Sequence, residues 1–310
     1  MTGVHRDVAA ALMARDRAHA PVNVGIAAQL ACLLEVSAPK PGNVSPGRHF
    51  ADLRYEDFLA SALAIGVAMA EAGERGVGAT IRLAVEASAA WARSNTNLGI
   101  VLLFAPLARA ASLLASESAK RDAFERSSFQ DAARQVLAST TIEDARDAYA
   151  AIRLARPGGL DRAESQDVSM EPTVTLVEAM RLAAHRDTVA SEYASGFEIT
   201  FRTAVPALER ARRDGLSWDD AVVEAFLTLL AAVPDTHIAR RSGKDFAAEV
   251  STQAVAVLEQ GGVRSELGRQ ALEGMDRALR DGRNSGNPGT TADLTAAALF
   301  VVLLGGGWNF

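Results

Sequence analysis

The sequence has little cysteine, no excess of positive charge and no long hydrophobic run. Its single cysteine among 310 residues, Cys32, can form neither an intrachain disulfide nor a cysteine-based metal site, which fits a reducing compartment. Cys32 lies in the apolar run 26–34, so we predict a small buried side chain rather than a nucleophile. The net charge of −6 argues against a general nucleic-acid-binding protein, which would usually be basic.

The two longest apolar runs, residues 98–107 and 296–304, are far shorter than the roughly 20 residues that a bilayer span requires. The first 20 residues interleave Arg with Asp and contain no continuous apolar stretch, which is unlike a secretory signal. We therefore expect a cytoplasmic protein that does not associate with a membrane. Hydrophobic residues at 49% and charged residues at 23% are typical of a compact globular chain, which excludes disorder over the whole length.

Alanine is abundant, and apolar positions recur every three or four residues, which predicts helices. Helix starts are expected where Thr141 precedes Asp144 and where Ser217 precedes Asp220, as in a capping box. Pro234 is expected to end the second of these helices, and another helix is expected over about 245–260. One predicted helical face carries Phe58, Ala62, Ile65 and Met69.

These signals predict an all-α fold, because no segment shows convincing strand alternation. We expect a single compact multi-helix domain over residues 1–310, in which loops at helix N-termini form one pocket. Within it, residues 1–22 are expected to be an N-terminal extension. Residues 156–172, which contain Pro and Gly, are expected to be a long loop.

The loop at residues 35–52 places Lys40 between two prolines and close to Gly42. Proline fixes the backbone φ angle, and glycine lets a chain approach a ligand closely. A rigid cation beside a glycine suits a phosphate group. The alternative is a rigid turn between helices with a solvated lysine.

A second loop, residues 94–99, directly precedes the apolar run 100–107. Small polar residues before a helix leave free backbone N–H groups at its positive end, which favours anion binding. The alternative is ordinary capping by Asn95 or Asn97.

The third loop, residues 234–244, combines Asp235, His237 and three cations. The cations suit a triphosphate, and Asp235 could hold Mg²⁺ or act as a base. His237 could also be a general base, and the alternative is a structural histidine beside a solvated basic face.

The fourth loop, residues 284–293, leads into the apolar helix expected over 294–304. It is not a Walker P-loop, because the G-x-x-x-x-G-K-[ST] pattern is absent. The alternative here is an ordinary capped helix with Asp293 in its first turn. Together, the four loops indicate a site for a nucleotide polyphosphate with a metal ion.

Over about residues 26–305 the chain resembles the triphosphoribosyl-dephospho-CoA synthase family. The resemblance rests on E-V-S-A-P-K-P-G-N-V at 35–44 with His49 and Asp52, and on N-T-N-L-G at 95–99. It rests also on Asp235-Thr236 with Arg241 and Gly243, and on P-G-T-T-A-D-L at 288–294. The resemblance implies an all-helical transferase that joins ATP to 3′-dephospho-CoA and releases adenine. Its product is the precursor of a prosthetic group for citrate or malonate decarboxylating enzymes.

Such a transfer breaks the bond between C1′ of the ATP ribose and adenine, through a transition state that resembles an oxocarbenium ion. The reaction needs a carboxylate near C1′, a base for the attacking ribose 2′-hydroxyl and a proton for the leaving adenine. The predicted catalytic residues are Glu35, Asp52 and Asp235, with Asp52 or Glu35 near the ribose. Asp235 and Asp293 are the predicted ligands of Mg²⁺. The predicted substrate- and phosphate-binding residues are Lys40, Pro41, Gly42, Asn43, His49, Asn95, Thr96, Asn97, Gly99, Arg241, Gly243, Gly289, Thr290 and Thr291.

The second loop departs from the family pattern N-T-H-K-G, because Asn97 and Leu98 replace a histidine and a lysine. One alternative is therefore a divergent member with another acceptor, for example in one-carbon, methanopterin-type cofactor biosynthesis. Another alternative is a helical module that binds a nucleotide without turnover. For the synthase and for both alternatives the expected partners are small nucleotides, and ATP is a substrate of the synthase and of the divergent transferase. The sequence leaves open whether the protein forms a homo-oligomer.

Overall fold

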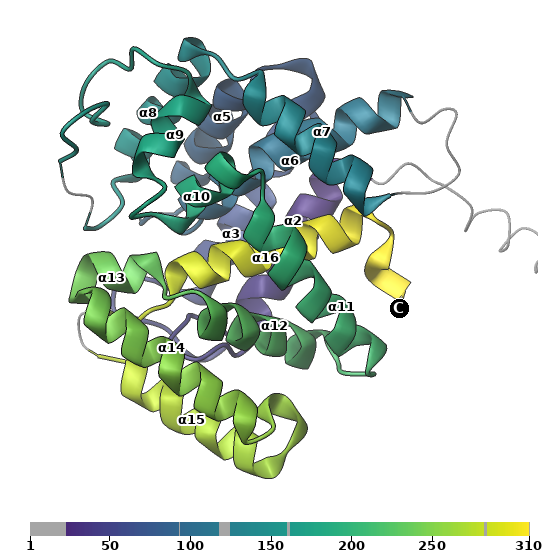
Figure 1. The fold of residues 1–310 in the computed structure, drawn as a ribbon, viewed down its shortest axis with the longest axis vertical. Helices are drawn as coiled ribbons and strands as arrows, with labels where there is room; N and C mark the ends of the chain where they lie inside the picture. The colour runs from purple at the N-terminus through teal and green to yellow at the C-terminus, as the bar shows by residue number, and fades with distance from the viewer. Residues whose placement is uncertain (1–22, 93, 118–124, 160–161, 282–283, 310) are drawn as a thin grey trace, which may run out of the picture.

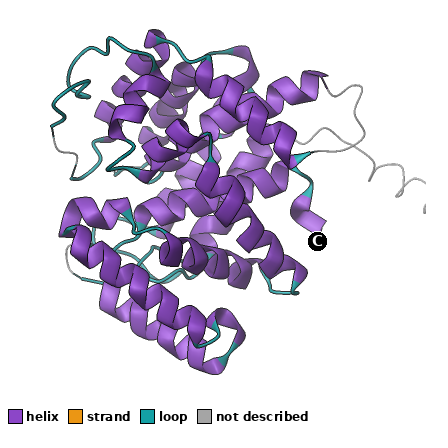
Figure 2. Cartoon of the chain, viewed as in Figure 1, coloured by secondary structure: helices purple, strands orange, loops and turns teal. Residues whose placement is uncertain are grey.

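The computed structural model describes residues 23–92, 94–117, 125–159, 162–281 and 284–309, and over these residues it consists of helices and loops (Figures 1 and 2). The described part contains no strand, only an isolated bridge between Ser45 and Arg48. The predicted all-α fold is confirmed. The predicted N-terminal extension, residues 1–22, lies outside the described residues. The α-helices are α2 (Val24–Ser37), α3 (Tyr55–Ala64), α4 (Gly66–Ala70), α5 (Val77–Ala89), α6 (Leu98–Glu117), α7 (Arg126–Ala138), α8 (Ile142–Ala155), α9 (Leu176–Ala183), α10 (Thr188–Ser195), α11 (Val205–Arg213), α12 (Trp218–Ala232), α13 (Thr236–Ser242), α14 (Lys244–Glu259), α15 (Glu266–Leu279) and α16 (Gly289–Leu304).

Local capping determines where several of these helices begin. Thr141 and Asp144 form a reciprocal capping box before α8, and the Ser217 hydroxyl accepts from the Asp220 amide at the start of α12. Helix α12 then ends at Ala232, before Pro234, and α14 covers the stretch expected at 245–260. These helix predictions are confirmed, because they depend on contacts within one turn of the chain.

Two helix boundaries differ from the sequence prediction. The face expected to run from Phe58 to Met69 is divided between α3 and α4. The chain breaks where the Gln29 amide donates to the Leu63 carbonyl at 2.8 Å, and where Gly66 lies so close to Gln29 that a Cβ would be 2.3 Å from its Nε2. Helix α16 begins at Gly289 rather than near 294, because Asp235 satisfies a backbone amide in its first turn.

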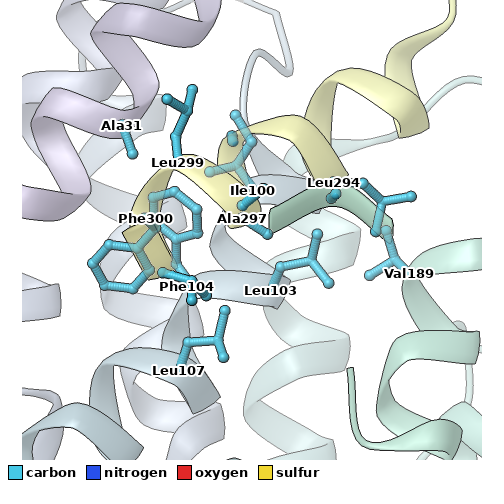
Figure 3. Packing of buried hydrophobic residues seen from close by; sticks show 14 of the residues in the cluster. Ala31, Ile100, Leu103, Phe104, Leu107, Val189, Leu294, Ala297, Leu299 and Phe300 are labelled. Carbon is cyan, nitrogen blue, oxygen red and sulfur yellow. The ribbon is translucent and has the colours of Figure 1, made fainter. Parts of the chain in front are cut away.

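Helix α16 lies at the centre of the fold, and α2, α6 and α12 pack around it (Figure 1). Its apolar side chains are buried on all sides, as expected for a helix that other helices enclose. Phe300 of α16 stacks on Phe104 of α6, with ring centroids 4.4 Å apart (Figure 3). One hydrophobic cluster thus joins the helices and fixes the ends of α2, α6 and α16 relative to one another.

By length and composition, the stretch Leu98–Ala115 of helix α6 is long and apolar enough to cross a membrane. In the fold, 61% of this stretch is buried. Its interior Pro106 lacks an N–H, which leaves the Leu102 carbonyl without its usual helical donor. The Tyr193 hydroxyl donates to that carbonyl at 2.6 Å. The protein interior therefore provides both the apolar surroundings and the missing hydrogen bond of this helix.

Candidate active site

Helices α6, α10, α13 and α16 bring their N-termini together, and we call the residues at these ends the helix-end cluster. Thr236 at the start of α13 has its hydroxyl 3.3 Å from that of Thr188 on α10 and 3.2 Å from that of Thr290 on α16. Gly99 in the first turn of α6 lies against Asp293 of α16. Helix N-termini carry partial positive charge, which favours anionic groups, including the carboxylates that cap some of these helices.

Asp235 joins two of these helices. Its carboxylate accepts from the amide of Ile238 at 2.9 Å, which caps α13. It also accepts from the amide and the hydroxyl of Thr291 at 2.7 and 2.8 Å, which ties α13 to the start of α16. Burial raises the pKa of Asp235, and these hydrogen bonds oppose the rise. Both of its oxygens are used within the protein.

The carboxylate of Asp293, unlike that of Asp235, accepts no hydrogen bond from another described residue. It lies partly buried in the second turn of α16, facing the first turn of α6. Burial raises the pKa of Asp293 well above its ordinary value, and the negative charges of Glu35, Asp235 and Asp187 raise it further. A carboxyl group with a raised pKa and no internal partner is a candidate for proton transfer.

Lys40 is completely buried, so the alternative of a solvated lysine is wrong. Its ammonium forms an ion pair with Glu35 at 3.0 Å and donates to the backbone carbonyls of Ala38, at 3.1 Å, and of Glu35. This pairing compensates the buried charge of Glu35 at the end of α2. Lys40 therefore braces the loop from within, and it could reach a phosphate only by giving up these oxygens.

The first and fourth loops contact each other directly. Pro41, Gly42 and Asn43 are buried, and the side-chain amide of Asn43 donates to the side-chain oxygen of Asn287. Gly42 has a φ of +75°, and a Cβ there would lie only 3.0 Å from Pro288 Cδ, so this close approach requires glycine.

Asp276 and Arg280, at the end of α15, hold the first loop in place. Asp276 accepts from the Gly42 amide at 2.8 Å and from the Arg48 guanidinium at 3.0 Å. Arg280 donates to Asp276 at 2.9 Å and to the Asn43 carbonyl at 2.5 Å. Sequence reasoning missed this pair, and the only available signal was a carboxylate and a guanidinium four residues apart just before the fourth loop.

His49 and Asp52 are exposed and lie outside the helix-end cluster. They line a surface hollow of about 210 Å³ together with Phe50, Ala51, Arg280, Asp281 and Asn284. His49 and Asp52 thus lie apart from the predicted site residues at the helix ends.

The polar side chains of the second loop are used within the protein. Asn95 caps α6 by accepting from the Leu98 amide at 3.0 Å, as the capping alternative predicts. The Thr96 hydroxyl lies 2.6 Å from that of Ser61. Asn97 is buried, and its amide donates to Ser88 Oγ at 3.0 Å. Gly99 is the member of this loop that faces Asp293.

His237, at the start of α13, lies so close to Gly289 that a Cβ on that glycine would be 2.2 Å from its Nδ1. Burial lowers the pKa of His237 from 6.5 to about 4, and the charges of Arg240 and Arg241 contribute. The imidazole is therefore neutral near pH 7. Arg241 and Gly243 lie at the other end of this short helix, where both are exposed.

Asp187 is a further residue of the helix-end cluster that the sequence did not assign. It caps α10 by accepting from the Ala190 amide at 3.1 Å, and it pairs with Arg240 of α13 at 2.6 Å. A usable signal exists in the dipeptide Asp-Thr, which occurs at Asp187-Thr188 and again at Asp235-Thr236, each time at a helix start.

The side chains available as ligands determine how the predicted Mg²⁺ could be held. Among the described residues, no group of three or more His, Cys, Asp or Glu side chains could hold a metal ion. Mg²⁺ is, however, often held by one or two carboxylates together with substrate phosphates and water. Asp293 fits that role, whereas the oxygens of Asp235 are already used by Ile238 and Thr291.

The structure thus defines an all-helical protein in which a buried carboxyl group, without a hydrogen-bond donor among the described residues, lies between helix N-termini. A family model described as ATP:dephospho-CoA triphosphoribosyl transferase matches residues 21–310. The chain therefore belongs to this family.

Individual relatives agree with this assignment. A 2-(5″-triphosphoribosyl)-3′-dephosphocoenzyme-A synthase of Pectobacterium atrosepticum is 40% identical over 105 residues, which cover 34% of this chain and 33% of that protein. A Pseudomonas syringae pv. tomato protein that carries the same synthase name is 35% identical over 106 residues, 34% of this chain and 36% of that protein. The match thus spans about a third of the length of these relatives. A crystal structure from Archaeoglobus fulgidus that also carries the synthase name is 28% identical and covers 81% of this chain and all of that one, with a TM-score of 0.60.

Proposed function

We propose that the protein transfers the triphosphoribosyl group of ATP to the ribose 2′-hydroxyl of 3′-dephospho-CoA, with release of adenine. The observation that carries the proposal is the position of Asp293, the carboxyl group that lacks a hydrogen-bond donor among the described residues. Gly99 of the second loop lies against it, and the charges of Glu35 and Asp235, from the first and third loops, raise its pKa. The bond from C1′ to adenine breaks, and a bond from C1′ to the acceptor oxygen forms. The proton of the acceptor hydroxyl leaves through a base, and the departing adenine takes up a proton.

Asp293 is our candidate for the group that meets the reacting ribose. Its raised pKa suits a group that exchanges a proton during the reaction. The glycine at position 99 provides the room that this carboxyl occupies, because a Cβ there would lie 2.0 Å from its Oδ2. Glu35 supports the site through its ion pair with Lys40 and by its charge, which contributes to the raised pKa of Asp293.

The triphosphate would lie at the N-termini of α6 and α16, where backbone amides favour anions. Mg²⁺, if it enters with the triphosphate, would be held by Asp293 and would neutralise phosphate charge. Asp235 acts in this proposal as a positioning residue, because its carboxylate ties α13 to Thr291. The remaining predicted contacts, and the cytoplasmic location, stay predictions.

One observation favours a second candidate, a transferase of this family with another acceptor. Asn97 and Leu98, which replace the family's histidine and lysine, are both buried, and the Asn97 amide is directed to Ser88 and to the Ser61 carbonyl. Neither residue supplies the cation or the imidazole that the family pattern places there. The acceptor could differ as a result.

The test is adenine release by the purified protein with ATP and Mg²⁺, in the presence and absence of 3′-dephospho-CoA. We expect release that depends on this acceptor, and a product whose mass corresponds to the acceptor plus the triphosphoribosyl group. Asp293→Asn should lower kcat by roughly 10²–10⁴-fold. Asp245→Asn, which changes an exposed carboxylate in the first turn of α14, is the matched control and should keep the wild-type rate.

Other outcomes contradict the proposal in distinct ways. Release that requires a different acceptor would support the divergent transferase. Tight ATP binding without adenine release would support a non-catalytic module. Release that is undiminished in Asp293→Asn would remove Asp293 from the reaction.

A further inference from the structure

Arg240 lies on the face of α13 that takes part in the helix-end cluster. It follows Thr236 by four residues, and side chains four residues apart share one face of a helix. The Thr236 hydroxyl on that face lies 3.3 Å from the Thr188 hydroxyl and 3.2 Å from that of Thr290. Arg241, the next residue, is turned by about 100° around the helix axis and is exposed. The two neighbouring arginines therefore differ in their relation to the cluster.

The guanidinium of Arg240 is held on one side by Asp187, the residue that caps α10. Its Nη1 donates to Asp187 Oδ2 at 2.6 Å, and the two side chains are 25% and 28% exposed. The described structure records no other hydrogen bond from this guanidinium, so Nε and Nη2 are left to donate. A partly buried arginine that a carboxylate orients, and that keeps free donors, is suited to a phosphate group.

The charge of Arg240 acts on the carboxyl group that the proposed function places at the reacting ribose. Burial and the nearby acids raise the pKa of Asp293, and the positive charge of Arg240 opposes that rise. Such an effect requires the two groups to lie near each other, because the interaction of charges weakens with distance. Lys40, another predicted phosphate-binding cation, is completely buried and paired with Glu35. Arg240, in contrast, is both close to Asp293 and accessible.

We propose that Arg240 binds the triphosphate of ATP, with its free guanidinium nitrogens donating to phosphate oxygens beside Asp293. The inference rests on the proposed function, and it assigns the phosphate-binding cation of the third loop to Arg240 rather than to Arg241. The other substrate, 3′-dephospho-CoA, carries a diphosphate of its own. We assign the triphosphate because it is attached to the ribose that the proposed function places at Asp293.

The first test measures the binding of inorganic triphosphate to the full-length protein by calorimetry, without turnover. Arg240→Gln should weaken this binding by roughly tenfold or more, because a neutral amide replaces a charged donor. Arg269→Gln is the matched control, because Arg269 of α15 also joins two helices through an ion pair, with Asp220 of α12 at 2.9 Å. It should bind triphosphate like the wild type. Equal binding by wild type and Arg240→Gln, or no binding by the wild type, would overturn the inference.

A second variant separates phosphate binding from a structural role of the ion pair. Asp187→Asn breaks the pair, leaves Arg240 in place and keeps a residue type that caps helices well. It also removes a negative charge beside the phosphates, so it should bind triphosphate at least as tightly as the wild type. Binding as weak as that of Arg240→Gln would mean that the pair acts only through the fold, and the inference would be wrong.

The kinetics of adenine release identify which phosphates Arg240 binds. Arg240→Gln should raise KM for ATP by roughly tenfold or more and leave KM for 3′-dephospho-CoA within about threefold of wild type. Arg240→Lys should recover part of the loss, because it keeps the charge without the planar group. A rise confined to KM for 3′-dephospho-CoA would refute the assignment to the triphosphate. Failure of the proposed function would appear differently, as a wild-type protein that binds triphosphate through Arg240 but releases no adenine.

Discussion

Replacing Gly99 by alanine tests whether the position of the Asp293 carboxyl controls the reaction. A Cβ at position 99 would lie 2.0 Å from Asp293 Oδ2 and 2.5 Å from its Cγ, whereas Cβ atoms essentially never approach other heavy atoms within 3.0 Å. The carboxyl group must therefore move by about 1 Å, and a displacement of that size at a reacting group can cost about 100-fold in rate. We expect kcat for adenine release to fall by about that factor.

Folding should hardly change in Gly99→Ala. Alanine is favoured over glycine inside a helix by about 0.5–1 kcal/mol, and the atoms that must give way belong to the end of a flexible side chain. The free energy of unfolding in urea should therefore stay within about 1 kcal/mol of wild type. Loss of rate without loss of stability would locate the effect at the carboxyl group.

Gly274→Ala in α15 is the control, because it is also a helical glycine and the nearest atom to its added Cβ is 4.0 Å away. It should keep the wild-type kcat. A Gly99→Ala protein with wild-type kcat would refute the reasoning, because the reaction would then tolerate a displaced Asp293.

Three further changes have outcomes that the buried charges determine. Lys40→Met should destabilise the protein by about 3–5 kcal/mol in urea unfolding, because it leaves Glu35 buried without its partner, and adding Glu35→Gln should restore most of the loss. The raised pKa of Asp293 means that wild-type stability is greatest when this group is protonated and declines as pH rises through the folded-state pKa. Asp293→Asn should therefore be more stable than wild type at pH 8, by about 1.4 kcal/mol for each unit by which the pKa is raised, and equal to it near pH 3. The pKa of His237 is lowered to about 4, so its contribution to the free energy of unfolding is present above pH 6.5 and is lost as pH falls toward 4. This loss amounts to roughly 3 kcal/mol over the full window, and His237→Gln should lack it. Equal pH dependence of stability in the two proteins would contradict this prediction.

The features that the sequence predicts well depend on neighbouring residues. The starts of α8 and α12 follow from Thr141 and Ser217, whose hydroxyls reach amides three residues ahead. Cys32 is buried because it lies in an apolar helix, as its surroundings in the sequence indicate. Such signals need no knowledge of the tertiary structure.

The rest of the candidate site depends on contacts between distant segments. The orientation of Lys40 follows from the position of Glu35 at the end of α2, and the pair of Asp187 with Arg240 joins residues 53 positions apart. The Asp276 contact with Gly42 spans 234 positions. Spacing in the sequence can identify residues whose side chains are suited to binding or catalysis. Only the packing of α2, α13 and α15 decides which of these side chains already have hydrogen-bond or ion-pair partners.

The hydrogen-bond and ion-pair partners distinguish Asp293 from the other acids near it. Asp187 is paired with Arg240, Asp235 binds Thr291, and Glu35 is paired with Lys40. Asp293 receives none of these contacts in the described structure, yet it experiences the negative charge of all three acids, which raises its pKa. In the proposed reaction, the proton affinity of this carboxyl group would therefore rise as a triphosphate approaches and fall if a divalent cation binds.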